Sequence, residues 1–124
     1  MIFVYGIPSC DSVKKARAWL AERGVAHTFH DFKKAGVPAD RLTAWIAAVG
    51  VDKVLNRQGT TWRKLSPSVQ ASAADEAGAS ALMVAHPSVI KRPVVEWGGR
   101  DGAITVGFDA QRWDGLAGPA SAST

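Results

Sequence analysis

Cysteine is almost absent from this sequence of 124 residues, which contains only one, Cys10. A single cysteine excludes an intramolecular disulfide, and Val13 occupies the position where a CxxC motif would place its second cysteine. Any disulfide that forms at Cys10 must therefore be resolved by a thiol from another molecule. The lack of disulfides also fits a reducing compartment, so we expect a cytoplasmic location.

Long apolar runs are absent as well. No uninterrupted stretch approaches the roughly 18 apolar residues that span a bilayer, so we expect no membrane association. The composition, 47% hydrophobic and 21% charged, is typical of a globular protein rather than a disordered one. A chain of this length is long enough for one domain with a single core and too short for two ordinary ones.

Dense basic segments are also missing, although the net charge is +4. The basic residues form no run longer than a pair, and the pairs are Lys14-Lys15, Lys33-Lys34, Arg63-Lys64 and Lys91-Arg92. Nucleic-acid binding favours a denser basic stripe or one interleaved with aromatic residues, so direct nucleic-acid binding is disfavoured. Arginines that converge on a small anionic substrate are compatible with this charge.

The three histidines do not predict a metal site. His27 and His30 are three positions apart in a predicted strand, so their side chains point to opposite faces, and no carboxylate cluster accompanies them. We expect no bound metal and no resident cofactor.

The residues on either side of the cysteine predict a strand, a tight turn and a helix. The apolar run Ile2–Tyr5 is typical of a buried strand. A helix is predicted over Val13–Arg23, because apolar residues recur there at helical spacing and a glycine follows. Asp11 or Ser12 is the predicted N-cap, which places the Cys10 sulfur at the mouth of the helix.

The rest of the chain adds one strand, several helices, a hairpin and a last helix. In chain order the predicted elements are a strand over 26–32, a loop over 33–38, a helix over 39–49, a short helix capped by Asp52, a helix start at Ser66-Pro67, a helix over 75–85, strands over 94–97 and 103–106, and a helix over 108–116. By itself this order indicates an α/β fold with one layer of sheet covered by helices.

The position of Cys10 predicts a reactive thiol. The first amides of a helix carry partial positive charge, which stabilises a thiolate and lowers the pKa of a cysteine from its usual value of about 8.5. Lys14 adds positive charge in the first turn, and we count Lys14 and Ser12 as candidate substrate-binding residues. The alternative is that Cys10 is a small buried core residue, as many free cysteines are.

Three separated segments resemble the arsenate reductase (ArsC)/Spx family, and most closely its YffB-like branch; they are Tyr5–Ala16, Leu55–Leu65 and Ile90–Val95. The resemblance covers the chain from Ile2 to about Leu116. It implies a thioredoxin-like fold, an α/β protein whose four-stranded mixed sheet has a helical insertion between its second and third strands.

We therefore expect one thioredoxin-like domain over 1–116 with the insertion at about 38–86, followed by a flexible tail over 117–124.

The resemblance also implies residues of the site. Pro93 matches a cis-proline that lies against the active thiol in thioredoxin-like folds, so Arg92 is expected beside the sulfur, where it can stabilise a thiolate and bind an oxyanion. Arg57 matches a second arginine near the cysteine, and Trp62 is a candidate to flank the thiol. The alternative for each arginine is an exposed surface charge. Arsenate reductases have a third arginine where this sequence has Gly107, which disfavours arsenate as the substrate.

Together these residues predict a monothiol, glutathione-dependent thiol-disulfide reductase, which is an oxidoreductase. In this hypothesis Cys10 is the nucleophile, and Arg92 and Arg57 bind the anionic part of a small anionic or disulfide substrate or of glutathione. Glutathione or glutaredoxin is the expected partner that supplies the second thiol. Two alternatives stay open: an arsenate reductase, and a non-catalytic Spx-like transcriptional regulator that binds RNA polymerase.

Overall fold

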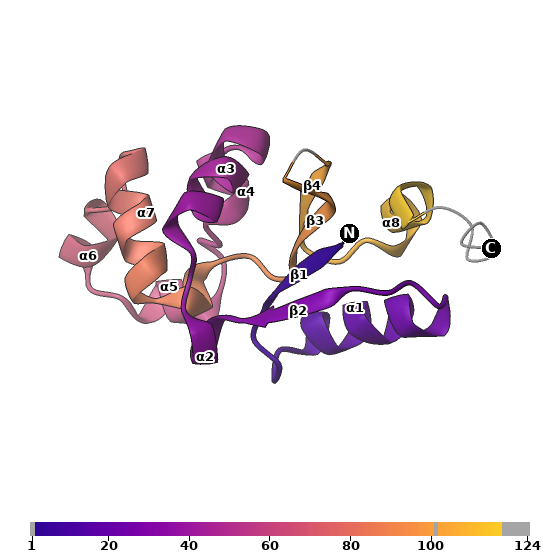
Figure 1. Ribbon diagram of the computed structural model, residues 1–124. Coiled ribbons are helices and arrows are strands. Elements are labelled where there is room, and N and C mark those ends of the chain that lie inside the picture. The colour runs from indigo at the N-terminus through magenta and orange to yellow at the C-terminus, as the bar shows by residue number, and fades with distance from the viewer. Residues whose placement is uncertain (1, 101, 118–124) are drawn as a thin grey trace. The chain divides into compact units, whose positions relative to one another are not determined.

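The computed structural model describes residues 2–100 and 102–117, so the predicted tail lies outside the described residues apart from Ala117. The chain divides into two compact units (Figure 1). We call them the sheet unit, Met1–Asp31 with Arg92–Thr124, and the helical unit, Phe32–Lys91. The insertion predicted at about 38–86 falls within the helical unit. That the two units form one domain stays a prediction.

The described part of the sheet unit consists of a four-stranded sheet and two helices (Figure 1). Its elements are β1 (Phe3–Gly6), α1 (Asp11–Glu22), β2 (Thr28–Asp31), β3 (Val94–Arg100), β4 (Ile104–Val106) and α8 (Ala110–Ala117). The strand order is β2-β1-β3-β4, in which β1 and β2 are parallel and the other two pairs are antiparallel. The predicted four-stranded mixed sheet, with helices inserted between its second and third strands, is confirmed.

α1 packs against the sheet because its apolar residues form one stripe. Val13, Ala16 and Leu20 recur at helical spacing and are fully buried. Ala16 and Leu20 lie in one core cluster with residues of β1, β3 and α8, namely Val4, Val95, Trp97 and Trp113. Since Val4 and Val95 are paired across the sheet, α1 and α8 cover the same face of it. This packing fixes the start of α1 relative to β1, the strand that leads into Cys10.

Aromatic rings complete this core. The Trp113 ring of α8 lies edge-on to Trp19, Trp97 and Phe108, with centroid distances of 5.7, 4.9 and 4.8 Å. The Trp97 indole N–H donates to Thr105 Oγ1 at 3.0 Å, so this polar group is satisfied inside the core.

The helical unit contains short helices joined by tight turns (Figure 1). Its elements are α2 (Phe32–Ala35), α3 (Ala39–Val49), α4 (Val51–Val54), α5 (Thr60–Lys64), α6 (Pro67–Ala71), α7 (Glu76–Ala85) and the 3-10 helix η1 (Pro87–Val89). The helix predicted over 39–49 is confirmed, and Gly50 ends it with φ of 92°. Ser66 caps α6 as predicted, because its hydroxyl accepts the Val69 N–H.

Two local predictions for this part of the chain are wrong, and one helix was missed. The loop predicted over 33–38 is helical in its first half, since α2 begins at Phe32. α5 was not predicted, and the N-cap of α4 is Gly50 rather than Asp52. Helices of four or five residues are too short to show a periodic apolar pattern and depend on the packing around them.

Candidate active site

Cys10 stands between β1 and α1, where the backbone turns into the helix. Its N–H donates to the Ile7 carbonyl at 3.0 Å, and its own carbonyl accepts the Lys14 N–H at 2.9 Å. Cys10 is therefore the N-cap residue of α1, and its backbone is extended, with φ of −71° and ψ of 128°. The prediction of Asp11 or Ser12 as the cap is wrong, because the helix already begins at Asp11.

The pKa of the half-buried Cys10 thiol is lowered from its usual value. Burial raises the pKa. Hydrogen bonds donated by the Val13 N–H, the Arg92 side chain and the Ser12 N–H lower it, as does the Arg92 charge. The lowering is larger than the effect of burial. These amides act on the sulfur although no cap hydrogen bond of standard geometry joins it to α1. The surroundings of Cys10 thus favour the thiolate, the nucleophilic form of cysteine.

Arg92 and Pro93 lead into β3, and the peptide bond between them is cis, as the resemblance implies. Tyr5 near the end of β1 pairs with Val94 at the start of antiparallel β3. The segment that leaves β1 and the segment that enters β3 are therefore at the same end of the sheet. This register brings the half-buried Arg92 to the Cys10 sulfur.

Ser12 and Lys14 lie in the exposed first turn of α1. Ser12 contributes its backbone N–H to the sulfur. Lys14 lines a surface pocket on the exposed side of the helix, together with Pro8 and Arg17 among others. The substrate-binding roles of Ser12 and Lys14 stay predictions.

Arg57 and Trp62 belong to the helical unit. Arg57 Nη1 forms an ion pair with Asp52 Oδ1, and its guanidinium lies 5.7 Å from the centroid of the Trp62 ring. Sequence reasoning missed Asp52 as the partner of Arg57, and an acidic residue five positions away in an irregular segment is a weak signal. The predicted roles of Arg57 and Trp62 at the thiol stay predictions.

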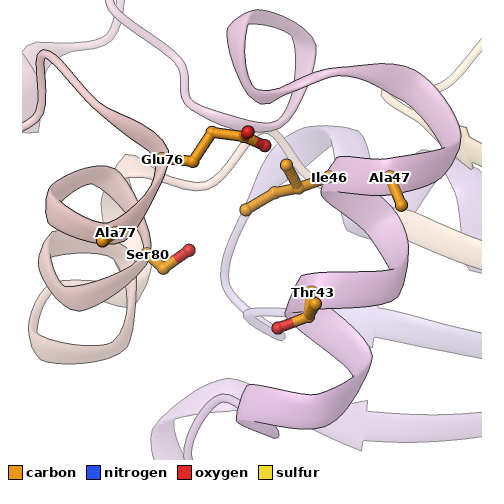
Figure 2. Close-up of a pocket in the computed structure, with 6 residues that line it drawn as sticks. All are labelled: Thr43, Ile46, Ala47, Glu76, Ala77 and Ser80. Carbon is orange, nitrogen blue, oxygen red and sulfur yellow. The ribbon is translucent and has the colours of Figure 1, made fainter.

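Figure 2 shows a second pocket, between α3 and α7 in the helical unit. It has a volume of about 240 Å³ and is lined by Thr43, Ile46, Ala47, Glu76, Ala77 and Ser80. Ile46 and Ser80 point into the space between the two helices (Figure 2). The lining contains one carboxylate and no basic, cysteine or histidine side chain, so it provides no arrangement for nucleophilic catalysis.

Residues 2–100 and 102–117 contain neither a candidate metal site nor a candidate membrane span. No three histidine, cysteine, aspartate or glutamate side chains in these ranges are grouped so that they could hold a metal ion. No helix in the same ranges has the length and hydropathy needed to cross a bilayer.

The profile of the ArsC family matches residues 5–116 of this chain. The chain belongs to the ArsC family. A solved structure named YffB protein is 46% identical and covers 95% of this chain and 100% of its own, with a TM-score of 0.88. The structure of an arsenate reductase (ArsC) related protein from Brucella melitensis is also 46% identical, covers 92% of both chains and has a TM-score of 0.70.

A curated relative, the global transcriptional regulator Spx of Streptococcus agalactiae, is 29% identical over 77% of this chain and 69% of its own. These similarities confirm the predicted ArsC/Spx family, its YffB-like branch and the thioredoxin-like fold.

Gly6 sets how closely α1 approaches β1 in this ArsC-family protein. A Cβ at position 6 would lie 2.7 Å from Cγ2 of Val13, a stiff β-branched side chain that is fully buried. Gly6→Ala is therefore expected to displace the first turn of α1, lower the free energy of unfolding by about 1–3 kcal/mol and raise the pKa of Cys10. Urea unfolding and the pH profile of Cys10 alkylation measure the two effects.

Gly115→Ala in α8 is the matched control, because a Cβ there meets no atom within 4 Å. The control is expected to keep or slightly raise the stability. Equal stability of Gly6→Ala and the wild type would contradict the close packing of Gly6 against Val13.

The lowered pKa of Cys10 predicts a pH-dependent contribution to the stability of the ArsC-family protein. A thiolate favoured by the folded state stabilises it fully above the unfolded-state pKa of about 8.5, and this contribution is lost as the pH falls through the lower folded-state pKa. The contribution of Cys10 is the difference in free energy of unfolding between the wild type and Cys10→Ala. We therefore expect this difference to rise from about pH 6 to about pH 9. Urea unfolding across this range measures the difference, and a constant or falling difference would contradict the lowered pKa.

Proposed function

We propose that this ArsC-family protein is a monothiol reductase that uses glutathione to reduce disulfides. The observation that carries the proposal is the Cys10 sulfur at the start of α1 with Arg92 acting on it, an arrangement that lowers the pKa of the thiol. A thiolate is the attacking species in thiol-disulfide exchange. Because the chain has a single cysteine, a thiol of another molecule completes each turnover.

In the proposed cycle the Cys10 thiolate attacks one sulfur of a substrate disulfide. A new disulfide forms between Cys10 and that half of the substrate, and the other half leaves as a thiolate that takes a proton from water. A glutathione thiolate then attacks the substrate sulfur of this mixed disulfide, so a glutathione-substrate disulfide leaves and the Cys10 thiolate is regenerated. A second cycle on that product yields glutathione disulfide. Over both cycles two glutathione molecules supply the two electrons that the substrate disulfide accepts.

Arg92 has two roles in this proposal. Its charge and its hydrogen bond stabilise the Cys10 thiolate before the attack, and they stabilise it again as the leaving group when glutathione resolves the mixed disulfide. Its guanidinium also suits an anionic group of the substrate. We assign Arg57 a supporting role toward the same anion. The ion pair with Asp52 holds Arg57 in one orientation but also offsets part of its charge.

A coupled assay tests the proposed function. Hydroxyethyl disulfide, glutathione, glutathione reductase and NADPH are mixed with the protein, and the oxidation of NADPH is followed. We expect a rate that is proportional to protein concentration and requires glutathione. A rate equal to that without the protein, with glutathione or with glutaredoxin as the reductant, would overturn the proposal.

Arsenate reduction is the alternative within the same chemistry, and the Brucella structure named as arsenate reductase related supports considering it. Gly107, which stands where the resemblance expects a third arginine, has φ of 81° and donates its N–H to the Pro93 carbonyl at 2.9 Å. An arginine would be strained in this left-handed conformation, so the backbone here favours glycine. We expect arsenate to be reduced more slowly than the disulfide in the same assay.

Binding to RNA polymerase is the alternative from another class, and the 29% identity to Spx supports testing it. A protein-protein contact can form without a second cysteine, so Val13 in place of that cysteine does not exclude this alternative. A pull-down with the C-terminal domain of the polymerase α-subunit separates the two readings, and we expect no retention of this protein.

A further inference from the structure

A pocket on the exposed side of α1 is lined by several basic side chains. We call it the basic pocket; it has a volume of about 390 Å³ and is lined by Pro8, Lys14, Arg17, Ala18, Ala21 and His27. Three of these side chains are basic and none is acidic. All six residues belong to the sheet unit, as Cys10 does. The lining thus combines positive charge with the small apolar side chains of Pro8, Ala18 and Ala21.

The two permanent charges of the basic pocket are not neutralised by the described residues. Neither Lys14 nor Arg17 forms an ion pair there, whereas Arg23 on the same helix pairs with Asp114 at 2.6 Å. The Arg17 guanidinium lies 4.2 Å from the centroid of the Phe29 ring, a cation-π contact that restricts where it points. Two neighbouring cations without an acidic partner suit an anion as ligand.

The residues of the basic pocket start close to Cys10 in the sequence and continue along α1. Pro8 precedes the cysteine by two residues, and with a helical rise of 1.5 Å per residue Lys14 and Arg17 lie about 6 and 10 Å from it along the axis. In extended glutathione the sulfur lies roughly 7–8 Å from the glycine carboxylate and roughly 10 Å from the α-carboxylate of the γ-linked glutamate. A glutathione sulfur at Cys10 therefore leaves a carboxylate within reach of these two side chains.

We propose that the basic pocket binds a carboxylate of glutathione while the glutathione thiolate attacks the mixed disulfide of Cys10. The inference rests on the proposed function, because it assigns the pocket to the same co-substrate. Lys14 and Arg17 supply the charge and the hydrogen-bond donors. His27 precedes β2, at the opposite end of the parallel strands from Cys10, and its Nδ1 lies 3.4 Å from the Val25 carbonyl. The pocket selects peptidyl thiols that carry a carboxylate over neutral thiols of similar reactivity.

The test compares one anionic and one neutral thiol on the same mixed disulfide. Cys10 is first converted to its disulfide with 2-mercaptoethanol, and its resolution by glutathione or by 2-mercaptoethanol is followed by intact mass. In Lys14→Gln/Arg17→Gln we expect the rate constant for glutathione to fall about fivefold to tenfold relative to that for 2-mercaptoethanol. Lys14→Gln alone, which leaves the Arg17 contact with Phe29 intact, is expected to lose about threefold with glutathione.

Lys15→Gln/Arg112→Gln is the matched control, because it removes two exposed charges from the same unit that do not line the pocket. A loss of glutathione preference in the pocket variants but not in the control supports the inference. The same preference in all the proteins overturns the inference, and turnover of hydroxyethyl disulfide by the wild type then leaves the proposed function standing.

A wild type without disulfide turnover overturns the proposed function but leaves the pocket testable. The probe in that case is S-methylglutathione, which keeps both carboxylates and cannot form a disulfide. Calorimetric binding that is lost in Lys14→Gln/Arg17→Gln and kept in the control supports the basic pocket. Absence of binding to the wild type overturns it.

Discussion

Cys10→Ser is expected to lower the glutathione-dependent reduction of hydroxyethyl disulfide by at least about 10³-fold. A serine hydroxyl stays protonated at neutral pH and forms no disulfide, so neither half of the proposed cycle can proceed. The chain has no second cysteine that could substitute for the first. The effect is therefore expected on kcat/KM for every disulfide substrate, and the coupled assay with NADPH measures it.

The fold of Cys10→Ser is expected to stay intact, since Cys10 is the N-cap of α1 and serine is a favoured N-cap residue. A thermal unfolding midpoint at neutral pH equal to or slightly above that of the wild type would show this. Ser9→Ala, an exposed change in the same turn, is the control and is expected to keep full activity. Turnover of Cys10→Ser within tenfold of the wild type would contradict the assignment of Cys10 as the nucleophile.

Arg92→Ala is expected to lower kcat/KM for disulfide reduction by about 10-fold to 100-fold at pH 7. Loss of the guanidinium raises the pKa of Cys10, and each unit of pKa lowers the thiolate fraction about tenfold at a pH below both values. A more basic thiolate is also a better nucleophile, which recovers part of this loss. Removal of the anion contact adds to the loss with charged substrates.

Arg92→Lys separates the effect of the positive charge of Arg92 from the effect of its guanidinium shape. Lysine retains the positive charge but not the planar fork of donors, so an intermediate rate is expected. At a pH above the raised pKa the rates of Arg92→Ala and the wild type are expected to converge for the neutral hydroxyethyl disulfide, because both thiols are then ionised. A deficit that is the same at every pH would contradict the role of Arg92 in stabilising the thiolate.

The turn that holds Cys10 could be predicted in outline because its signals are local. A short β-branched and aromatic run, a glycine and a stripe of apolar residues at helical spacing are enough to predict β1, the turn and α1. The N-cap was assigned one or two residues too late, since aspartate and serine are more frequent caps than cysteine. Cap preference is a weak signal compared with the hydrogen bond from the Lys14 N–H to the Cys10 carbonyl.

The approach of Arg92 to the sulfur depends on a contact between distant parts of the chain. It follows from the antiparallel register of Tyr5 with Val94, and no local pattern reports such a register. The resemblance to a family supplied this expectation, together with the cis bond before Pro93.

The surroundings of Arg57 were missed for a related reason. The Asp52–Arg57 pair lies in a segment of short helices and turns, where neither residue has a periodic neighbour from which a partner could be inferred. Residues of this kind are located by packing rather than by sequence pattern, as are the four-residue α2 and the five-residue α5.

The most direct test of an activated Cys10 thiolate is the rate of its alkylation by iodoacetamide against pH, for the wild type and for Arg92→Ala. Because the chain has one cysteine, the mass shift of the intact protein has a single origin. We predict a midpoint well below about 8.5 for the wild type and a higher midpoint for the variant. A wild-type midpoint at or above about 8.5, or the same midpoint in both proteins, would contradict a thiolate activated by the start of α1 and Arg92.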